Sequence, residues 1–243
     1  MSGRHTNAHR GTARLSRTVQ RTPGWTPILS RSVAVLILTA ASTLGGCNAQ
    51  TPAEDLRANG DRAMRLGLYQ DAADNYGALA ARYPGDWDAQ HKLGLVMLEL
   101  DQPREARRAL EVAHTRRPDD PNIADALAES LFRIDDQRQL FAFLNNRAET
   151  TQSTLAYLRL ADYSRRVGDP DAARVAVHTA IELDDGTSVQ PYLVAAALAE
   201  EVGDVDRAIH RLRQAYGIDP RNGTVRERLV LLGEVPGPTI ALP

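Results

Sequence analysis

Small apolar residues recur along this chain with a period of about 34 residues. Segments that begin at Ala53, Trp87, Pro121, Thr154 and Val189 are spaced 34, 34, 33 and 35 residues apart, and a sixth, partial segment begins at Gly223. The eighth position of the five segments is always small: Gly60, Gly94, Ala128, Ala161 and Ala196. The twentieth position is small in four of them: Ala72, Ala106, Ala173 and Ala208. Helices approach to about 8–10 Å only where the contact positions lack bulk, so each segment is expected to form a close helical pair.

Larger apolar residues fill the positions between the small ones, and helix breakers separate the segments. The larger set comprises Leu93, Leu127 and Leu160 in the first halves and Tyr76, Leu110, Leu144, Val177 and Leu212 in the second halves. Turn residues divide the halves at Gly67, Asp101–Pro103, Gly168–Pro170 and Gly203, and divide the segments at Pro84, Pro118 and Pro220. The pattern predicts five helical hairpins with a core made mainly of alanine and leucine.

Because several positions recur in register, the segment from 53 to about 233 resembles the tetratricopeptide repeat more than an ordinary helical bundle. The resemblance implies an all-α fold, a right-handed α-solenoid of about five hairpins with a C-terminal capping helix. Stacked hairpins bury a continuous core between neighbours and need a polar last unit. The expected repeats are 53–86, 87–120, 121–153, 154–188 and 189–222, followed by a capping helix over 223–233 and a proline-containing tail over 234–243.

The third repeat departs most from the pattern. Leu140 stands where the other repeats have alanine, Arg147 stands where a small or apolar residue is usual, and Gln152 replaces a closing proline. The second helix of this repeat is therefore expected to tilt or to pack loosely.

The N-terminal segment differs in kind from the repeats. Residues 1–46 contain six arginines and no Asp or Glu, and the uncharged run 33–44 is too short to span a bilayer, which needs roughly 20 apolar residues. Leu44-Gly45-Gly46-Cys47 resembles the lipobox of bacterial lipoproteins. The resemblance implies that 1–46 is a signal peptide, that Cys47 carries a lipid anchor, and that 47–52 is a short linker. The alternative is a free cysteine after an ordinary leader.

These features predict an exported protein, anchored to a membrane by lipid and facing the periplasm. Asn48 follows the cysteine where an inner-membrane retention signal would usually have Asp, so the resemblance favours the outer membrane over the inner one. The linker spans at most roughly 20 Å of extended chain, which would hold the array close to the lipid surface.

Charge and residue types exclude several functions. Without the six leader arginines, 23 basic residues face 31 acidic ones, a net charge of −8 that disfavours nucleic acid. One cysteine makes no thiolate metal cage, and the histidines lack metal-ligand spacing. We therefore expect no catalytic residues, no metal and no cofactor; an enzyme whose site assembles from distant repeats is the least favoured alternative.

The resemblance implies that the first helices of the repeats line a concave groove that holds a peptide or a helix. By the repeat register, the expected groove residues are Arg57, Asp61, His91, Leu95, Leu98, Asp125, Glu129, Phe132, Arg133, Leu158, Asp162, Arg165, Arg166 and Leu193. They combine an apolar seam with charges of both signs. They lack the Lys and Asn pattern of the clamp that grips C-terminal carboxylates in chaperone-binding relatives.

The sequence thus predicts a non-enzymatic lipoprotein that binds other proteins or peptides as an adaptor or assembly scaffold in the bacterial cell envelope. It is generally similar to tetratricopeptide lipoproteins of pilus assembly, outer-membrane biogenesis and peptidoglycan-enzyme recruitment, and the residues select none of the three. The alternative is a self-associating array, a homo-oligomer whose groove is filled by its own tail or by a second copy.

Overall fold

The computed structural model describes residues 51–237 and 239–242, and within them the chain forms α-helices and no strand. All the helices lie in the unit Ala49–Pro243. The helices are α1 (Ala53–Arg65), α2 (Tyr69–Arg82), α3 (Trp87–Glu99), α4 (Pro103–Arg116), α5 (Pro121–Arg133), α6 (Gln137–Thr151), α7 (Thr154–Arg166), α8 (Pro170–Asp184), α9 (Gln190–Glu201), α10 (Val205–Ile218) and α11 (Gly223–Leu231). The predicted Cys47 anchor, its leader and most of the linker lie outside the described residues.

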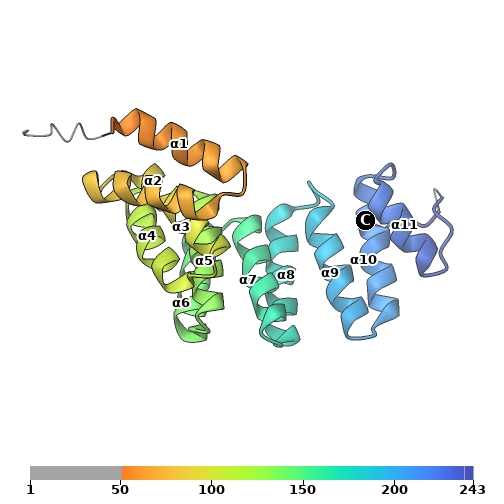
Figure 1. Cartoon of the computed structure of the whole chain (residues 1–243). Coiled ribbons are helices and arrows are strands. Elements are labelled where there is room, and N and C mark those ends of the chain that lie inside the picture. Colours follow the sequence, from red (N-terminus) through yellow and green to blue (C-terminus); the bar gives the residue numbers. More distant parts are fainter. Residues whose placement is uncertain (1–50, 238, 243) are drawn as a thin grey trace, which may run out of the picture. The chain divides into compact units, whose positions relative to one another are not determined.

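Consecutive helices pack as hairpins, and the hairpins stack in sequence order (Figure 1). Within this stack, first helices of neighbouring hairpins also touch, α3 with α5 and α7 with α9, whereas the second helices approach one another less closely. The fold class predicted from the sequence, an α-solenoid of helical hairpins, is confirmed.

A left-handed residue closes the turn inside each hairpin. It occupies the fifteenth position of every repeat: Gly67, Asp101, Asp135, Gly168 and Gly203, with φ between 55° and 84°. Glycine adopts this conformation without steric cost, and aspartate tolerates it better than most residues. The next backbone N–H then donates to a carbonyl five residues earlier, as from Asp136 to Leu131 at 3.1 Å. The turn thereby satisfies backbone groups at the end of the first helix.

Aspartate occupies the N-cap position of several helices. Asp86 accepts hydrogen bonds from the N–H groups of Asp88 and Ala89, and Asp120 caps α5 in the same way. Asp204 caps α10 by accepting from the N–H of Arg207. Side-chain oxygens at this position satisfy N–H groups that the helix itself leaves unpaired. These aspartates are thus N-cap residues that define where the helices begin.

The small residues of the repeat lie at the helix contacts, as expected. Ala128, Ala161 and Ala196 are almost fully buried. A Cβ built on Gly94 would stand 2.4 Å from Leu110 Cγ, which shows how closely α3 and α4 approach. The core therefore consists of alanine-lined helix contacts with leucine between them.

The third hairpin is the looser one, in agreement with its sequence. Leu140 is fully buried, and α5 and α6 approach one another less closely than the helices of the other four hairpins. Arg147 is not left without a partner, because its Nη1 donates a hydrogen bond to the carbonyl of Pro118 at 2.8 Å. A larger side chain at the contact position keeps the two helices apart.

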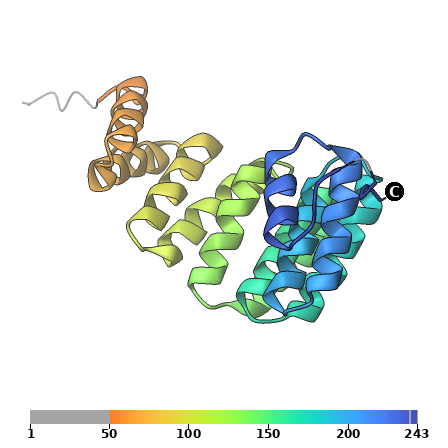
Figure 2. The same ribbon diagram turned by 90° about the vertical axis from the view of Figure 1, so that its right-hand side faces the viewer.

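The tail after α11 returns to α10 (Figure 2). Glu234 forms an ion pair with Arg213 at 2.7 Å, and the Leu242 N–H donates to the Arg213 carbonyl at 3.2 Å. Ile240 packs against the apolar cluster formed by α9, α10 and α11. Gly217 leaves room for this segment, because a Cβ there would meet the Leu242 carbonyl oxygen at 2.5 Å. The described part of the tail is thus laid on the surface.

Candidate functional site

The charged side chains predicted to line a groove on the first helices form ion pairs, some with one another and others with further charged residues. On α1, Arg57 bridges Asp86 at 2.5 Å and Asp88, both at the start of α3. Asp61, one turn further on, accepts from Lys92 of α3 at 2.8 Å. These ion pairs join the first helices of two successive repeats. Partly exposed pairs of this kind each contribute about 0.2–1 kcal/mol, so their main effect is on register and orientation.

Glu129 on α5 is the centre of a second cluster. Its carboxylate accepts from Arg133 at 2.8 Å, from Arg166 of α7 at 2.7 Å and from the Tyr163 hydroxyl at 3.2 Å. Burial raises the pKa of Glu129, but the hydrogen bonds from Arg166 and Arg133 outweigh burial, and the pKa lies below its ordinary value. The Arg166 guanidinium also lies 3.9 Å from the centre of the Phe132 ring. Phe132, an expected anchor for a partner, is therefore covered by this arginine.

Ion pairs continue along the remaining first helices. Asp125 pairs with Arg159 of α7 at 2.7 Å. Arg165 pairs with Asp162 at 3.0 Å and reaches Glu201 of α9 at 3.2 Å. The charged residues predicted to line the groove thus act largely as links between the first helices of successive repeats.

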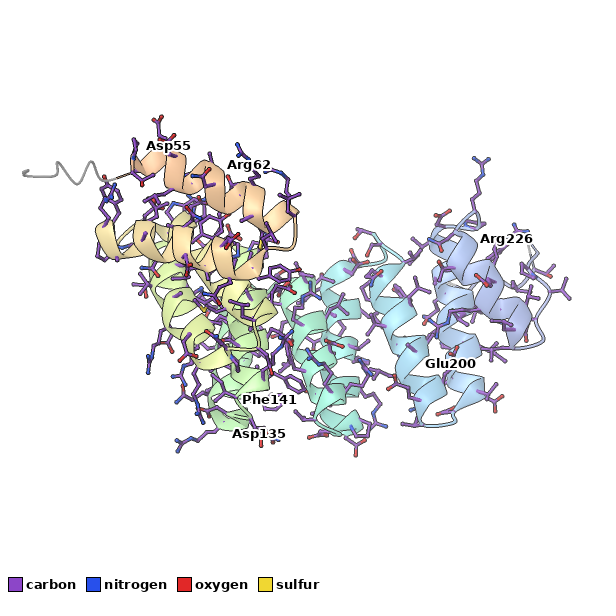
Figure 3. The ribbon with its side chains drawn as sticks, viewed as in Figure 1. Asp55, Arg62, Asp135, Phe141, Glu200 and Arg226 are labelled. Atoms are coloured by element: carbon purple, nitrogen blue, oxygen red, sulfur yellow. The ribbon has the colours of Figure 1, made fainter. Side chains whose placement is uncertain are left out.

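Glu200, labelled in Figure 3, continues this series to the last helix. It pairs with Arg228 of α11 at 2.8 Å, and Arg228 also donates to the Leu193 carbonyl at 3.1 Å. The capping helix is therefore tied to α9 through a partly buried arginine.

The apolar members of the predicted set differ in exposure. Leu98 is only 7% exposed and belongs to the core, which corrects its expected place as an exposed anchor. Leu95, Leu158 and Leu193 are half-buried against core clusters. The His91 imidazole is half-buried, burial lowers its pKa, and its Nε2 has no hydrogen-bond partner. Since Leu98 packs inward, the apolar seam is narrower than the sequence implied.

The second helices carry a cavity that the sequence reasoning missed. This cavity of about 530 Å³ lies between α8 and α10, and residues of α9 form its base. Its lining includes Val175 and Val202, which are 65% and 57% exposed. A further cavity of about 560 Å³ between α6 and α8 is lined in part by Phe141, labelled in Figure 3. The available sequence signal was the presence of apolar residues where a second helix should face solvent.

The described residues contain no helix long and apolar enough to cross a membrane. They also contain no group of three or more His, Cys, Asp or Glu side chains arranged to hold a metal ion.

Residues 63–129 match the family profile of the tetratricopeptide repeat. The crystal structure of MamA is similar, with a TM-score of 0.54 and 19% identity over 74% of this chain and 94% of MamA. A thermophilic TPR protein of Thermus thermophilus gives a TM-score of 0.50 and 18% identity over 74% and 98%. PilW, a widely conserved type IV pilus biogenesis factor, gives a TM-score of 0.54 and 14% identity over 73% of this chain and 82% of PilW. A comparison with curated proteins found no match.

The fold is therefore that of the tetratricopeptide-repeat proteins: an all-α array of stacked helical hairpins. Identities of 14–19% establish the fold, and the partner must be inferred from surface chemistry.

Proposed function

We propose that this protein is a non-enzymatic adaptor, tethered to the periplasmic face of a bacterial membrane by a lipid on Cys47, that binds another protein on the surface of its helical array. The observation that carries the binding role is the apolar cavity between α8 and α10 with its exposed rim of Val175 and Val202. Apolar side chains exposed around a hollow commonly mark a site where another protein docks.

The tether is supported by the Leu44-Gly45-Gly46-Cys47 sequence after a basic and then apolar leader. A lipid chain adds about 0.8 kcal/mol of membrane affinity per buried CH₂ group. The linker of 47–52 would keep the array within roughly 20 Å of the lipid. The outer membrane is favoured over the inner one because Asn48 follows the cysteine.

Membrane attachment is tested by fractionation of cells that express the full chain or Cys47→Ala. The wild type should sediment with membranes and resist a carbonate wash, whereas Cys47→Ala should appear in the soluble fraction. If Cys47→Ala stays in the washed membranes, the lipid anchor is wrong.

Partner binding is tested with photo-crosslinking residues placed at exposed positions of each face, at Arg165 on the first helices and at Val175 of α8 on the second helices. A discrete crosslinked band that contains a different protein supports the adaptor. Crosslinks between copies of this chain alone, together with an oligomer in light scattering, would instead establish the self-associating array.

A further inference from the structure

The groove between α8 and α10 has an apolar floor. Val177 and Leu198 lie at its base and are 2% and 7% exposed, and Ile181 of α8 is half-buried beside them. Val175 and Val202 stand at its edges with most of their surface in solvent. The apolar area that the groove exposes therefore comes mainly from Val175 and Val202, with a contribution from Ile181.

Arginines border this floor. Arg174 of α8 and Arg207 and Arg211 of α10 line the groove, and Asp171 is the one carboxylate among its lining residues. Arg174 pairs with Asp171 at 2.9 Å on its own helix, and Arg207 pairs with its own N-cap residue Asp204 at 3.3 Å. The groove is therefore positively charged, although residues 47–243 as a whole are acidic.

Comparison with the equivalent joint earlier in the array shows why this groove stays open. Between α4 and α6, Arg107 donates to Gln139 at 2.6 Å and lies 3.6 Å from Asp136. These two contacts of Arg107 link the second helices α4 and α6. In the repeat register, Arg174 corresponds to Arg107, and Arg207 corresponds to Gln139. Two cations, Arg174 and Arg207, therefore line the groove between α8 and α10. Asp204, which corresponds to Asp136, pairs with Arg207 on its own helix, and among the described residues no ion pair links α8 to α10.

We propose that this groove binds an acidic amphipathic helix of a partner protein, with apolar side chains on the floor and carboxylates against Arg174, Arg207 and Arg211. Two helices that flank an apolar floor suit a helix laid between them, and rim charges set its orientation. The 15 residues of α8 offer about 22 Å, or some four turns of a bound helix. The inference rests on the proposed adaptor role and assigns it a surface and a partner class.

The chain's own ends do not suit the groove. Residues 1–46 contain six arginines and no acidic residue, so they carry the same positive charge as the rim and are repelled by it. The described tail is held on α10 through Arg213 and Glu234, which do not line the groove. An acidic segment from another protein is the occupant that complements both the floor and the rim.

The probe is a labelled synthetic helix of about 18 residues, long enough to populate helix, with leucines on one face and glutamates beside them. A companion peptide keeps the leucines and replaces each glutamate by lysine. Fluorescence anisotropy with the full-length protein should show binding of the glutamate peptide that weakens with added salt, and at least tenfold weaker binding of the lysine peptide.

The variants test charge and apolar area separately. Arg174→Glu with Arg207→Glu should weaken the glutamate peptide about tenfold or more and improve the lysine peptide, because rim charges orient the ligand. The matched control is Arg62→Glu with Arg226→Glu, the same change in net charge on exposed arginines of α1 and α11 (Figure 3).

Val202→Asn should weaken the glutamate peptide several-fold at any salt concentration, since it removes apolar contact rather than charge. Val230→Asn is its control, because Val230 on α11 is 59% exposed against 57% for Val202. Circular dichroism confirms that each variant keeps its helices.

The inference is overturned by equal binding of both peptides, by equal loss in the Arg62/Arg226 control, or by no binding of the glutamate peptide up to its solubility limit. If the charge-reversed groove variant loses binding to anionic lipid vesicles while its peptide binding is unchanged, the surface faces lipid and the inference fails. If the crosslinked partner still binds this variant, the groove is wrong and the adaptor role stands.

Discussion

Replacing Gly94 by alanine tests whether close helix approach is what holds a hairpin together. A Cβ at this position would lie 2.4 Å from Cγ and 2.7 Å from Cδ2 of Leu110, which is fully buried on α4. The overlap falls on Cγ, close to the backbone, so a rotation of the terminal methyl groups cannot relieve it. Either Leu110 changes rotamer or α3 and α4 move apart.

The expected magnitude combines two opposing effects. Overpacking of a filled core costs about 1–3 kcal/mol. Alanine in a helix interior is favoured over glycine by about 1 kcal/mol. The free energy of unfolding should therefore fall by about 0–2 kcal/mol in Gly94→Ala.

Gly77 provides the matched control, because it lies inside α2 and a Cβ there would have no atom within 4 Å. Gly77→Ala gains the same helix propensity without the overlap, and should raise the stability by up to about 1 kcal/mol. The difference between the two variants, about 1–3 kcal/mol, isolates the close contact.

Urea denaturation followed by circular dichroism measures both variants and the double variant Gly94→Ala, Leu110→Val. The fourth repeat already combines Ala161 with Val177, and both are buried. Shortening Leu110 should therefore recover part of the loss and give a favourable coupling in the double-mutant cycle. If Gly94→Ala is as stable as Gly77→Ala, close helix approach does not limit this hairpin and the packing argument fails.

Further expectations concern flexibility, the tail and pH. Amide hydrogen exchange should be faster in 138–149 of α6 than in α4 or α10, since α5 and α6 pack less closely; equal protection would contradict this. Gly217→Ala should displace the tail through contact with the Leu242 carbonyl, so limited proteolysis should remove the tail faster while the thermal midpoint hardly changes. An unaltered cleavage rate would refute the close contact. Glu129→Gln should lower stability at pH 7, because in the folded protein the pKa of Glu129 lies below its ordinary value. The charged carboxylate therefore stabilises the fold at any pH above the ordinary pKa of glutamate. The difference from wild type should shrink as the pH falls through the lowered pKa of Glu129, and a difference that persists once Glu129 is protonated would argue against an ionic role.

The repeat period by itself determined that this chain forms stacked helical hairpins. Helix approach depends on the bulk of a few contact side chains, so residues such as Gly94 and Ala161 carry the signal in their type and spacing. The loose third hairpin was predictable for the same reason, because Leu140 occupies a contact position. The position of the turn inside each hairpin was also predictable from the sequence, since glycine or aspartate closes each one.

Only the tertiary structure decided which surface is free. The period identifies equivalent positions, but whether Arg166 reaches Glu129, or Leu98 turns inward, depends on the rotation and distance of neighbouring helices. Ion pairs between residues some 30 positions apart form only where that geometry brings the charges within about 4 Å. The same dependence placed Arg174 and Arg207 on the lining of one groove, because they come from different repeats and share a surface only once the helices have stacked.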